Sequence, residues 1–154
     1  MNVLESIRTF LDAQNISYKT WTHEPVHTSE EAAKIRGTPL ESGAKALVLR
    51  SEGKCLMVVI AGDKKMDLKK VKQAINAKRL SLATPEEALQ VTHCEIGSIP
   101  PFGNLFGIPV YLDQSLLRSP IINFNAGRHD TSIAMSIDDY QKAVKPELVD
   151  VAQE

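Results

Sequence analysis

The residues His23–His27 read His-Glu-Pro-Val-His, a pattern that could bind zinc. On a helix, this spacing places two histidines one turn apart on one face, with the glutamate as a general base. Pro25 lies inside the helix that zinc binding would require, where it removes an amide donor and its ring clashes with the carbonyl four residues earlier. The sequence offers no third ligand at a suitable spacing. We therefore expect no metal site here, and we assign His27 to the lining of a pocket.

A stronger signal is the stretch Gly97–Gly103, which reads Gly-Ser-Ile-Pro-Pro-Phe-Gly. The two consecutive prolines fix φ near about −65°, and Gly97 lets a ligand approach the backbone closely. We expect the amides of Ser98 and Ile99 to remain free and to point outward. A stiff loop with preset amides is suited to hold a carbonyl or an oxyanion. This stretch alone also allows a second interpretation, a rigid structural turn.

Lys45 interrupts an apolar stretch, residues 44–49, that otherwise reads as a core strand. A lysine at such a position is costly unless its ammonium reaches solvent or an anion. Two interpretations therefore stay open. Lys45 either binds an anionic or hydroxyl group of a substrate, or it is an edge lysine whose stem lies along the sheet while its head stays in water.

A third candidate is the stretch 124–130, Phe-Asn-Ala-Gly-Arg-His-Asp. Asn125 follows an apolar run, and Gly127 marks a tight bend. Asn125 either caps a strand end or offers its amide to a substrate, and the last residues of the stretch are expected in an exposed turn. A Ser-His-Asp assembly built on Ser98 is a further alternative, although no Gly-x-Ser-x-Gly elbow accompanies that serine.

The elements that must position these groups follow from apolar spacing and from end signals. Helical spacing predicts a helix over 2–14, and Thr-x-x-Glu capping boxes begin helices after Thr28 and Thr84. Apolar runs predict the strands. The expected strands are 16–21, 44–50, 54–61, 110–112, 121–125 and 132–135, and further helices begin after Asp67 and Ser136. This mixture without a regular βαβ repeat predicts a single α/β or α+β domain, residues 1–154, around a mixed sheet.

Composition supports one ordinary globular domain. The chain has 154 residues, of which 43% are hydrophobic and 24% charged, and its net charge is −1. The net charge of the chain therefore does not attract it to nucleic acid or to a membrane. Two cysteines are too few for a disulfide framework and favour a reducing cytosol. The longest apolar run, Cys55–Ala61, is far shorter than the roughly 20 residues that cross a bilayer, so a cytoplasmic protein is expected.

Charge is nevertheless uneven along the chain. Residues 64–79 contain seven basic residues and one acidic residue, Asp67. A basic helix on an acidic body could contact phosphates. A solvated helix face is the alternative interpretation of the same charge run.

Taken together, these motifs resemble the YbaK/ProX superfamily, the domain related to the editing insertion of bacterial prolyl-tRNA synthetase. The resemblance covers nearly the whole chain, and the order and spacing of the motifs carry it. They are His-Glu-Pro at 23–25, Ser-Glu-Glu-Ala-Ala at 29–33, Gly-Ala-Lys-Ala-Leu-Val at 43–48, Gly-Ser-Ile-Pro-Pro-Phe-Gly at 97–103 and Phe-Asn-Ala-Gly at 124–127. Together with Ile-Arg-Gly-Thr at 35–38, they look most like the YeaK branch.

The resemblance implies a free-standing trans-editing hydrolase that deacylates mischarged aminoacyl-tRNA carrying a small amino acid such as Ala, Ser or Thr. It also implies a mixed, barrel-like central sheet flanked by helices. The family's strand lysine falls on Lys45, where it is thought to engage the terminal adenosine region, and its Gly-x-x-x-Pro loop matches Gly97–Pro101. The chemistry implied is attack by water, assisted by the tRNA's own hydroxyl, without a metal, a cofactor or a covalent intermediate.

Two sets of site residues follow. The expected catalytic residues are Lys45, Gly97, Ser98 and Ile99, and the expected substrate-binding residues are His27, Pro100, Pro101, Phe102, Asn125, Ala126 and Gly127. The chain departs from the family at two places. Position 98 is Ser where relatives often have Gly, and position 100 is Pro where Ser is common. Both positions are expected where the amino-acid side chain is screened.

Alternative functions and partners remain to be separated by experiment. A non-catalytic module that binds tRNA or a synthetase is the runner-up, and a small-ester hydrolase that uses Ser98 is the third possibility. The expected partner is the acceptor end of aminoacyl-tRNA, with an aminoacyl-tRNA synthetase as a second candidate because a net charge of −1 argues against tight binding to tRNA alone. The protein is expected to be a monomer and to make no contact with a membrane.

Overall fold

The computed structural model describes residues 2–154, which form two β-sheets surrounded by helices. The larger sheet contains, in spatial order, β4 (Ser81–Leu82), β2 (Ala44–Ser51), β3 (Lys54–Ala61), β5 (Val110–Asp113) and β8 (Glu147–Val149). The smaller, antiparallel sheet has the order β1 (Lys19–Thr22), β7 (Thr131–Ser136) and β6 (Ile121–Asn125). The expected α/β architecture with a mixed sheet and flanking helices is confirmed. The barrel-like closure is not observed, because the strands divide into two sheets.

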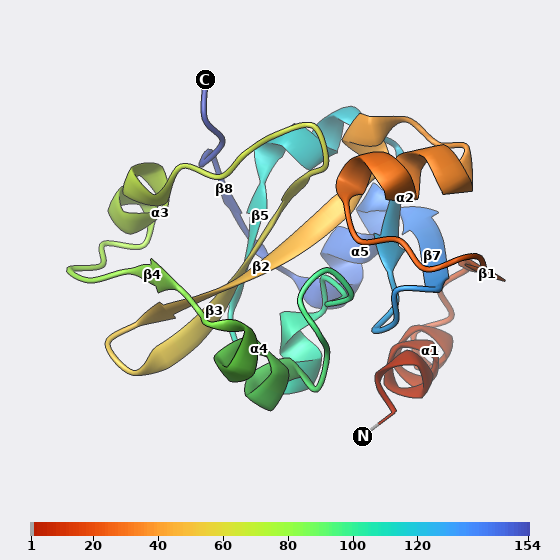
Figure 1. Ribbon diagram of the computed structural model, residues 1–154, viewed down its shortest axis with the longest axis horizontal. Coiled ribbons are helices and arrows are strands. Elements are labelled where there is room, and N and C mark those ends of the chain that lie inside the picture. Colours follow the sequence, from red (N-terminus) through yellow and green to blue (C-terminus); the bar gives the residue numbers. More distant parts are fainter. Residues whose placement is uncertain (1) are drawn as a thin grey trace.

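The helices begin where the sequence provides side-chain caps. They are α1 (Val3–Ala13), α2 (Ser29–Arg36), α3 (Leu68–Ala74), α4 (Pro85–Thr92) and α5 (Ile137–Val144). Both predicted capping boxes are present. The side chains of Thr28 and Thr84 each accept a hydrogen bond from the amide three residues later, and their own amides donate to the glutamate side chain of that later residue. Figure 1 shows α2 near one end of β2 and α4 near the other. In the described part of the chain, no helix is long and apolar enough to cross a bilayer.

Three strands differ from the expectation. The first strand begins only at Lys19, because the chain before it closes the end of α1 through the hydrogen bond from the Ile16 amide to the Leu11 carbonyl, 3.1 Å. The short edge strands β4 and β8 were not expected. They contain two and three residues, too few to give an apolar pattern of their own.

The edge of β2 that faces away from β3 pairs with β4 at Leu49 and Arg50 and is open before them. Gly43 accepts a hydrogen bond from the Gly62 amide on the β3 side, 2.8 Å, and Val48 accepts one from the Ala83 amide on the other side, 3.0 Å. Hydrogen-bonding direction alternates along an antiparallel strand, so Ala46 points its N–H and C=O the same way as Val48, away from β3. Within residues 2–154, no strand pairs with β2 at Ala46 on that side.

Phe102 is the centre of the main core. Its ring is fully buried and meets Phe124 and Tyr140 edge to face, with centroids 5.4 and 5.6 Å apart. The Tyr140 hydroxyl donates to the carbonyl of Pro101, 2.5 Å. The diproline segment is therefore held against α5 and against an aromatic cluster. Burial and edge-to-face contacts stabilise this cluster.

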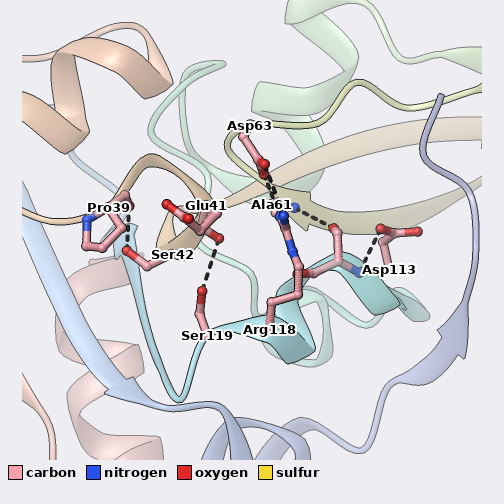
Figure 2. A network of polar contacts seen from close by, with 9 residues as sticks. Pro39, Glu41, Ser42, Ala61, Asp63, Asp113, Arg118 and Ser119 are labelled. Carbon is pink, nitrogen blue, oxygen red and sulfur yellow. Dashed lines mark hydrogen bonds and ion pairs between the residues drawn. The ribbon is translucent and has the colours of Figure 1, made fainter. Parts of the chain in front are cut away.

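A second group of contacts holds the start of β2 beside the end of β3. Figure 2 shows Arg118 reaching Asp63, where its Nη2 lies 2.6 Å from Oδ1. The same figure shows the Ser119 hydroxyl directed at the carbonyl of Glu41, 3.4 Å. Asn123 of β6 also donates to Ser42, 2.9 Å, and so ties the two sheets together. These contacts fix the backbone immediately before Lys45.

Candidate functional site

A cleft of about 300 Å³ lies along the open edge of β2. Its walls come from α2, the segment 82–88 that leads into α4, and the turn at 95–98. Most of the lining is small and apolar, and a few polar side chains interrupt it. The apolar lining residues include Ala32, Ala44, Ala46, Val48, Ala83, Ala88 and Ile99, and the polar ones include His27, Arg36, Lys45 and Asn125.

Lys45 lines this cleft and is partly buried. Burial lowers the pKa of its ammonium, while the nearby acids Glu30 and Asp63 raise the pKa and Lys65 lowers it. In the described chain, the Lys45 ammonium makes no ion pair and no side-chain hydrogen bond, although the residue pairs with Ile60 through its backbone. A desolvated ammonium without a partner is available to bind an oxygen atom of a ligand.

The turn Glu95–Ser98 forms another wall, and its geometry corrects one expectation. The Ser98 amide donates to the Glu95 carbonyl, 3.0 Å, and Gly97 at φ +90° occupies the position that a type II turn reserves for glycine. The prediction that the Ser98 amide is free is therefore wrong. The Ile99 amide has no acceptor among residues 2–154, so it stays available as a donor.

Asn125 connects this turn to a residue that sequence reasoning missed. Its Nδ2 donates to the Gly97 carbonyl, 2.7 Å, and its Oδ1 accepts from Nη2 of Arg36, 2.9 Å. Arg36 also donates from Nε to Ser132, 2.8 Å. Arg36 looks like an ordinary basic residue at a helix C-terminus, and its partners lie about 90 residues away along the chain, so local patterns could not reveal its role.

A second hollow, of about 440 Å³, shares the wall formed by His27 and the Glu95–Ser98 turn. The His27 and His129 rings meet in it with centroids 4.5 Å apart. Its remaining lining residues are Pro25, Leu89, His93, Cys94, Glu95, Ser98, Gly127, Arg128 and Asp130. Ser98 is 2% exposed and donates its hydroxyl to the Glu95 carbonyl, 2.8 Å, so no base is positioned to activate it.

The structure thus divides the predicted site residues into three groups. Lys45, Gly97, Ile99, His27 and Asn125 line the cleft together. Ser98 and Gly127 line the second hollow instead. Pro100, Pro101, Phe102 and Ala126 are buried and line neither space, so they support the walls from behind.

The His-Glu-x-x-His segment is not helical, as expected from Pro25. Residues 23–27 lie between β1 and α2. His23 directs Nε2 at the Ser132 hydroxyl, 2.7 Å, and Nδ1 at the Glu24 carbonyl, 2.7 Å. In the part of the chain that the structure describes, no three His, Cys, Asp or Glu side chains lie close enough together to hold a metal ion.

Comparison with known proteins adds an independent line of evidence. Residues 23–143 match the model of the aminoacyl-tRNA editing domain. The chain is 36% identical over 144 residues to the "Multifunctional Ser/Thr-tRNA deacylase ProXp-y" of Escherichia coli K12, covering 90% of this chain and 86% of that protein. It is 28% identical over 151 residues to the "Prolyl-tRNA editing protein ProX" of Acetoanaerobium sticklandii, covering 94% and 92%.

Solved structures agree on the fold. A crystal structure described as a candidate trans-editing enzyme for prolyl tRNA synthetase superposes with a TM-score of 0.89. The match covers 100% of this chain and 99% of the other at 23% sequence identity. At that identity the likeness concerns the architecture, which is the same in both chains.

Proposed function

Because this chain belongs to the aminoacyl-tRNA editing domain family, we propose that it deacylates mischarged aminoacyl-tRNA in trans, with seryl- and threonyl-tRNA as its principal substrates. One observation carries the proposal. The residues that line the cleft include Lys45, whose ammonium is unpaired, and Ile99, whose amide has no acceptor in the described chain, among mostly small apolar side chains. Such a space suits an ester that carries a small amino acid.

The proposed reaction needs only positioning and polarisation, since an aminoacyl ester is already activated. Water attacks the ester carbonyl carbon, the bond from that carbon to the ribose oxygen breaks, and the ribose oxygen takes up a proton. The Ile99 amide is proposed to donate to the carbonyl oxygen as negative charge develops on it. Lys45 is proposed to bind the terminal nucleotide and to hold the ester against that amide. The products are the free amino acid and uncharged tRNA.

The basic segment 64–79 supports contact with the acceptor end of the tRNA. It includes Lys65, which lies near enough to Lys45 to lower its pKa, so this segment begins close to the cleft, where the acids Glu30 and Asp63 also lie. An aminoacyl-tRNA synthetase is proposed as an additional partner that delivers the substrate. We expect the protein itself to be a monomer, which sedimentation velocity would establish.

A deacylation screen tests the proposal. The purified protein is incubated with tRNA charged with Ser, Thr, Ala, Cys or Pro, and the remaining ester is measured over time. We expect hydrolysis of the seryl and threonyl esters well above the spontaneous rate. If all of these esters persist while tRNA still binds with a steep salt dependence, the chain is a binding module and the proposed hydrolysis is wrong.

A further inference from the structure

Arg36 lines the cleft and is held in a single orientation by two side-chain hydrogen bonds. Its Nε donates to Ser132 and its Nη2 donates to Asn125. Ser132 is fully buried and also contacts Nε2 of His23. Because the Glu24 carbonyl can only accept, Nδ1 of His23 carries the proton, and in the neutral ring Nε2 accepts the Ser132 proton. The Ser132 lone pairs are then directed at Arg36.

The charge of Arg36 has no partner of opposite sign. Among residues 2–154 it makes no ion pair. Burial lowers its pKa to about 10, so the guanidinium remains positively charged at neutral pH. A partly buried cation without a carboxylate is expensive to keep. An oxygen atom supplied by a ligand would offset this cost.

One part of the guanidinium remains free to meet such an oxygen. Nη1 makes no hydrogen bond within the described chain and lies 3.8 Å from the place where a Cβ at Gly43 would be. Gly43 itself lines the cleft. The side-on pair of donors, Nε and Nη2, which would bind a carboxylate or phosphate in bidentate fashion, is already used by Ser132 and Asn125. Nη1 keeps both of its N–H donors, and either can meet an acceptor oxygen of a ligand.

We propose that Arg36 is the specificity-determining residue of the cleft and donates from Nη1 to the side-chain hydroxyl oxygen of a seryl or threonyl ester. This inference rests on the proposed function. Most of the lining consists of methyl and methylene groups, which cannot distinguish serine from alanine strongly, whereas a buried donor left unpaired by alanine can. Of the other polar lining residues, Asn125 already uses its amide nitrogen and its amide oxygen within the protein. Ser132, Asn125 and His23 act as positioning residues for the guanidinium.

The test compares two esters that differ by one oxygen atom. The same tRNA is charged with Ser or with Ala, and kcat/KM is measured for the protein and for Arg36→Met, which keeps the side-chain length and removes the donors. We expect kcat/KM for Ser to fall about 30-fold more than kcat/KM for Ala, the size of a charge-assisted hydrogen bond. Equal losses for the two esters would overturn the inference while leaving the proposed function intact.

Two further measurements keep the inference testable if Arg36→Met folds poorly. In the unaltered protein, threonyl-tRNA should be hydrolysed at least about 10-fold faster than 2-aminobutyryl-tRNA, which is the same ester without the hydroxyl. Equal rates would refute the role of the hydroxyl. Lys45→Ala is the matched control, since it should slow both esters alike and leave their ratio unchanged. Failure of the unaltered protein to cleave any ester would instead reject the proposed function itself.

Discussion

The cleft and the second hollow share a wall, yet their polar groups differ in one respect. The second hollow contains histidines, a cysteine, a serine and acids, the residue types that suggest catalysis. There, however, the charged groups pair with one another: Arg128 lies 2.8 Å from Asp130, and His129 lies 3.4 Å from Glu95. The cleft has fewer such residues, but Lys45 and Nη1 of Arg36 have no protein partner in the described chain. Cationic donors without a protein partner, more than residue type, distinguish the cleft as the candidate site.

The largest expected effect comes from removing the unpaired ammonium. Lys45→Ala should lower kcat/KM for the preferred ester by about 100-fold or more, the usual result of deleting a group that binds the reacting part of a substrate. Deacylation by the purified variant measures it. Lys34→Ala is the matched control, because Lys34 is an exposed lysine of α2 that does not line the cleft. Unchanged hydrolysis by Lys45→Ala would remove this lysine from the mechanism.

A smaller effect should follow from straining the shared wall. Gly97 has φ +90°, and a Cβ there would lie 3.3 Å from Cε1 of His129. Gly97→Ala should cost about 1–2 kcal/mol of stability and should lower kcat/KM about 10-fold by displacing the turn. Gly107→Ala is the control, since Gly107 has φ +70° with open space around it and does not line the cleft.

Urea unfolding and deacylation together separate strain from function in this pair. Both alanine variants should lose similar stability, but only Gly97→Ala should lose activity. If Gly107→Ala loses as much activity as Gly97→Ala, then the effect reports general destabilisation, and the turn has no special part in catalysis.

Ser98→Ala should have a much smaller effect. The hydroxyl is buried and donates to the Glu95 carbonyl, so its loss removes one neutral hydrogen bond, worth about 1 kcal/mol of stability. We expect kcat/KM to stay within about 3-fold of the unaltered protein. Mass spectrometry of protein mixed with substrate would detect an acylated serine. A trapped acyl group at Ser98, together with loss of activity in Ser98→Ala, would favour the serine-hydrolase alternative.

The smallest effect is expected at Cys94. Burial raises the pKa of this thiol to about 11, so at neutral pH it is protonated and a poor nucleophile. In a Cys55→Ser variant, a thiol reagent at pH 8 should therefore react only as fast as the protein unfolds. Fast labelling in the native state would show that the second hollow is reactive after all, and would weaken the contrast with the cleft.

Local signals in the sequence predicted the elements well but not the contacts between them. The threonine caps at Thr28 and Thr84 define helix ends through hydrogen bonds that span three residues, so the sequence alone was sufficient. The hairpin of β2 and β3 likewise follows from two adjacent apolar runs. The two-residue strand β4 depends on pairing with β2 and has no pattern of its own.

The candidate site was predictable only in part, for the same reason. Lys45 could be singled out because a charge interrupts an apolar strand. The turn at Gly97 could also be singled out, but the use of the Ser98 amide could not, since a turn's hydrogen bond depends on Glu95 as well. Phe102 looks similar to a ligand-binding aromatic in sequence, and only the packing of Phe124 and Tyr140 against it makes it core. Arg36 depends on partners from distant strands.

The open edge of β2 has a consequence for solubility. Exposed strand edges invite pairing with a strand of another molecule, which is a common route to aggregation. Here Ala46, α2 and the segment 82–88 line one cleft, so the open edge lies inside a space that has room for a small ligand. The walls that select a ligand thus also hinder the pairing of β2 with a strand of another molecule. Shortening the segment 82–88 to admit larger ligands would also expose unpaired backbone groups of β2 and favour aggregation.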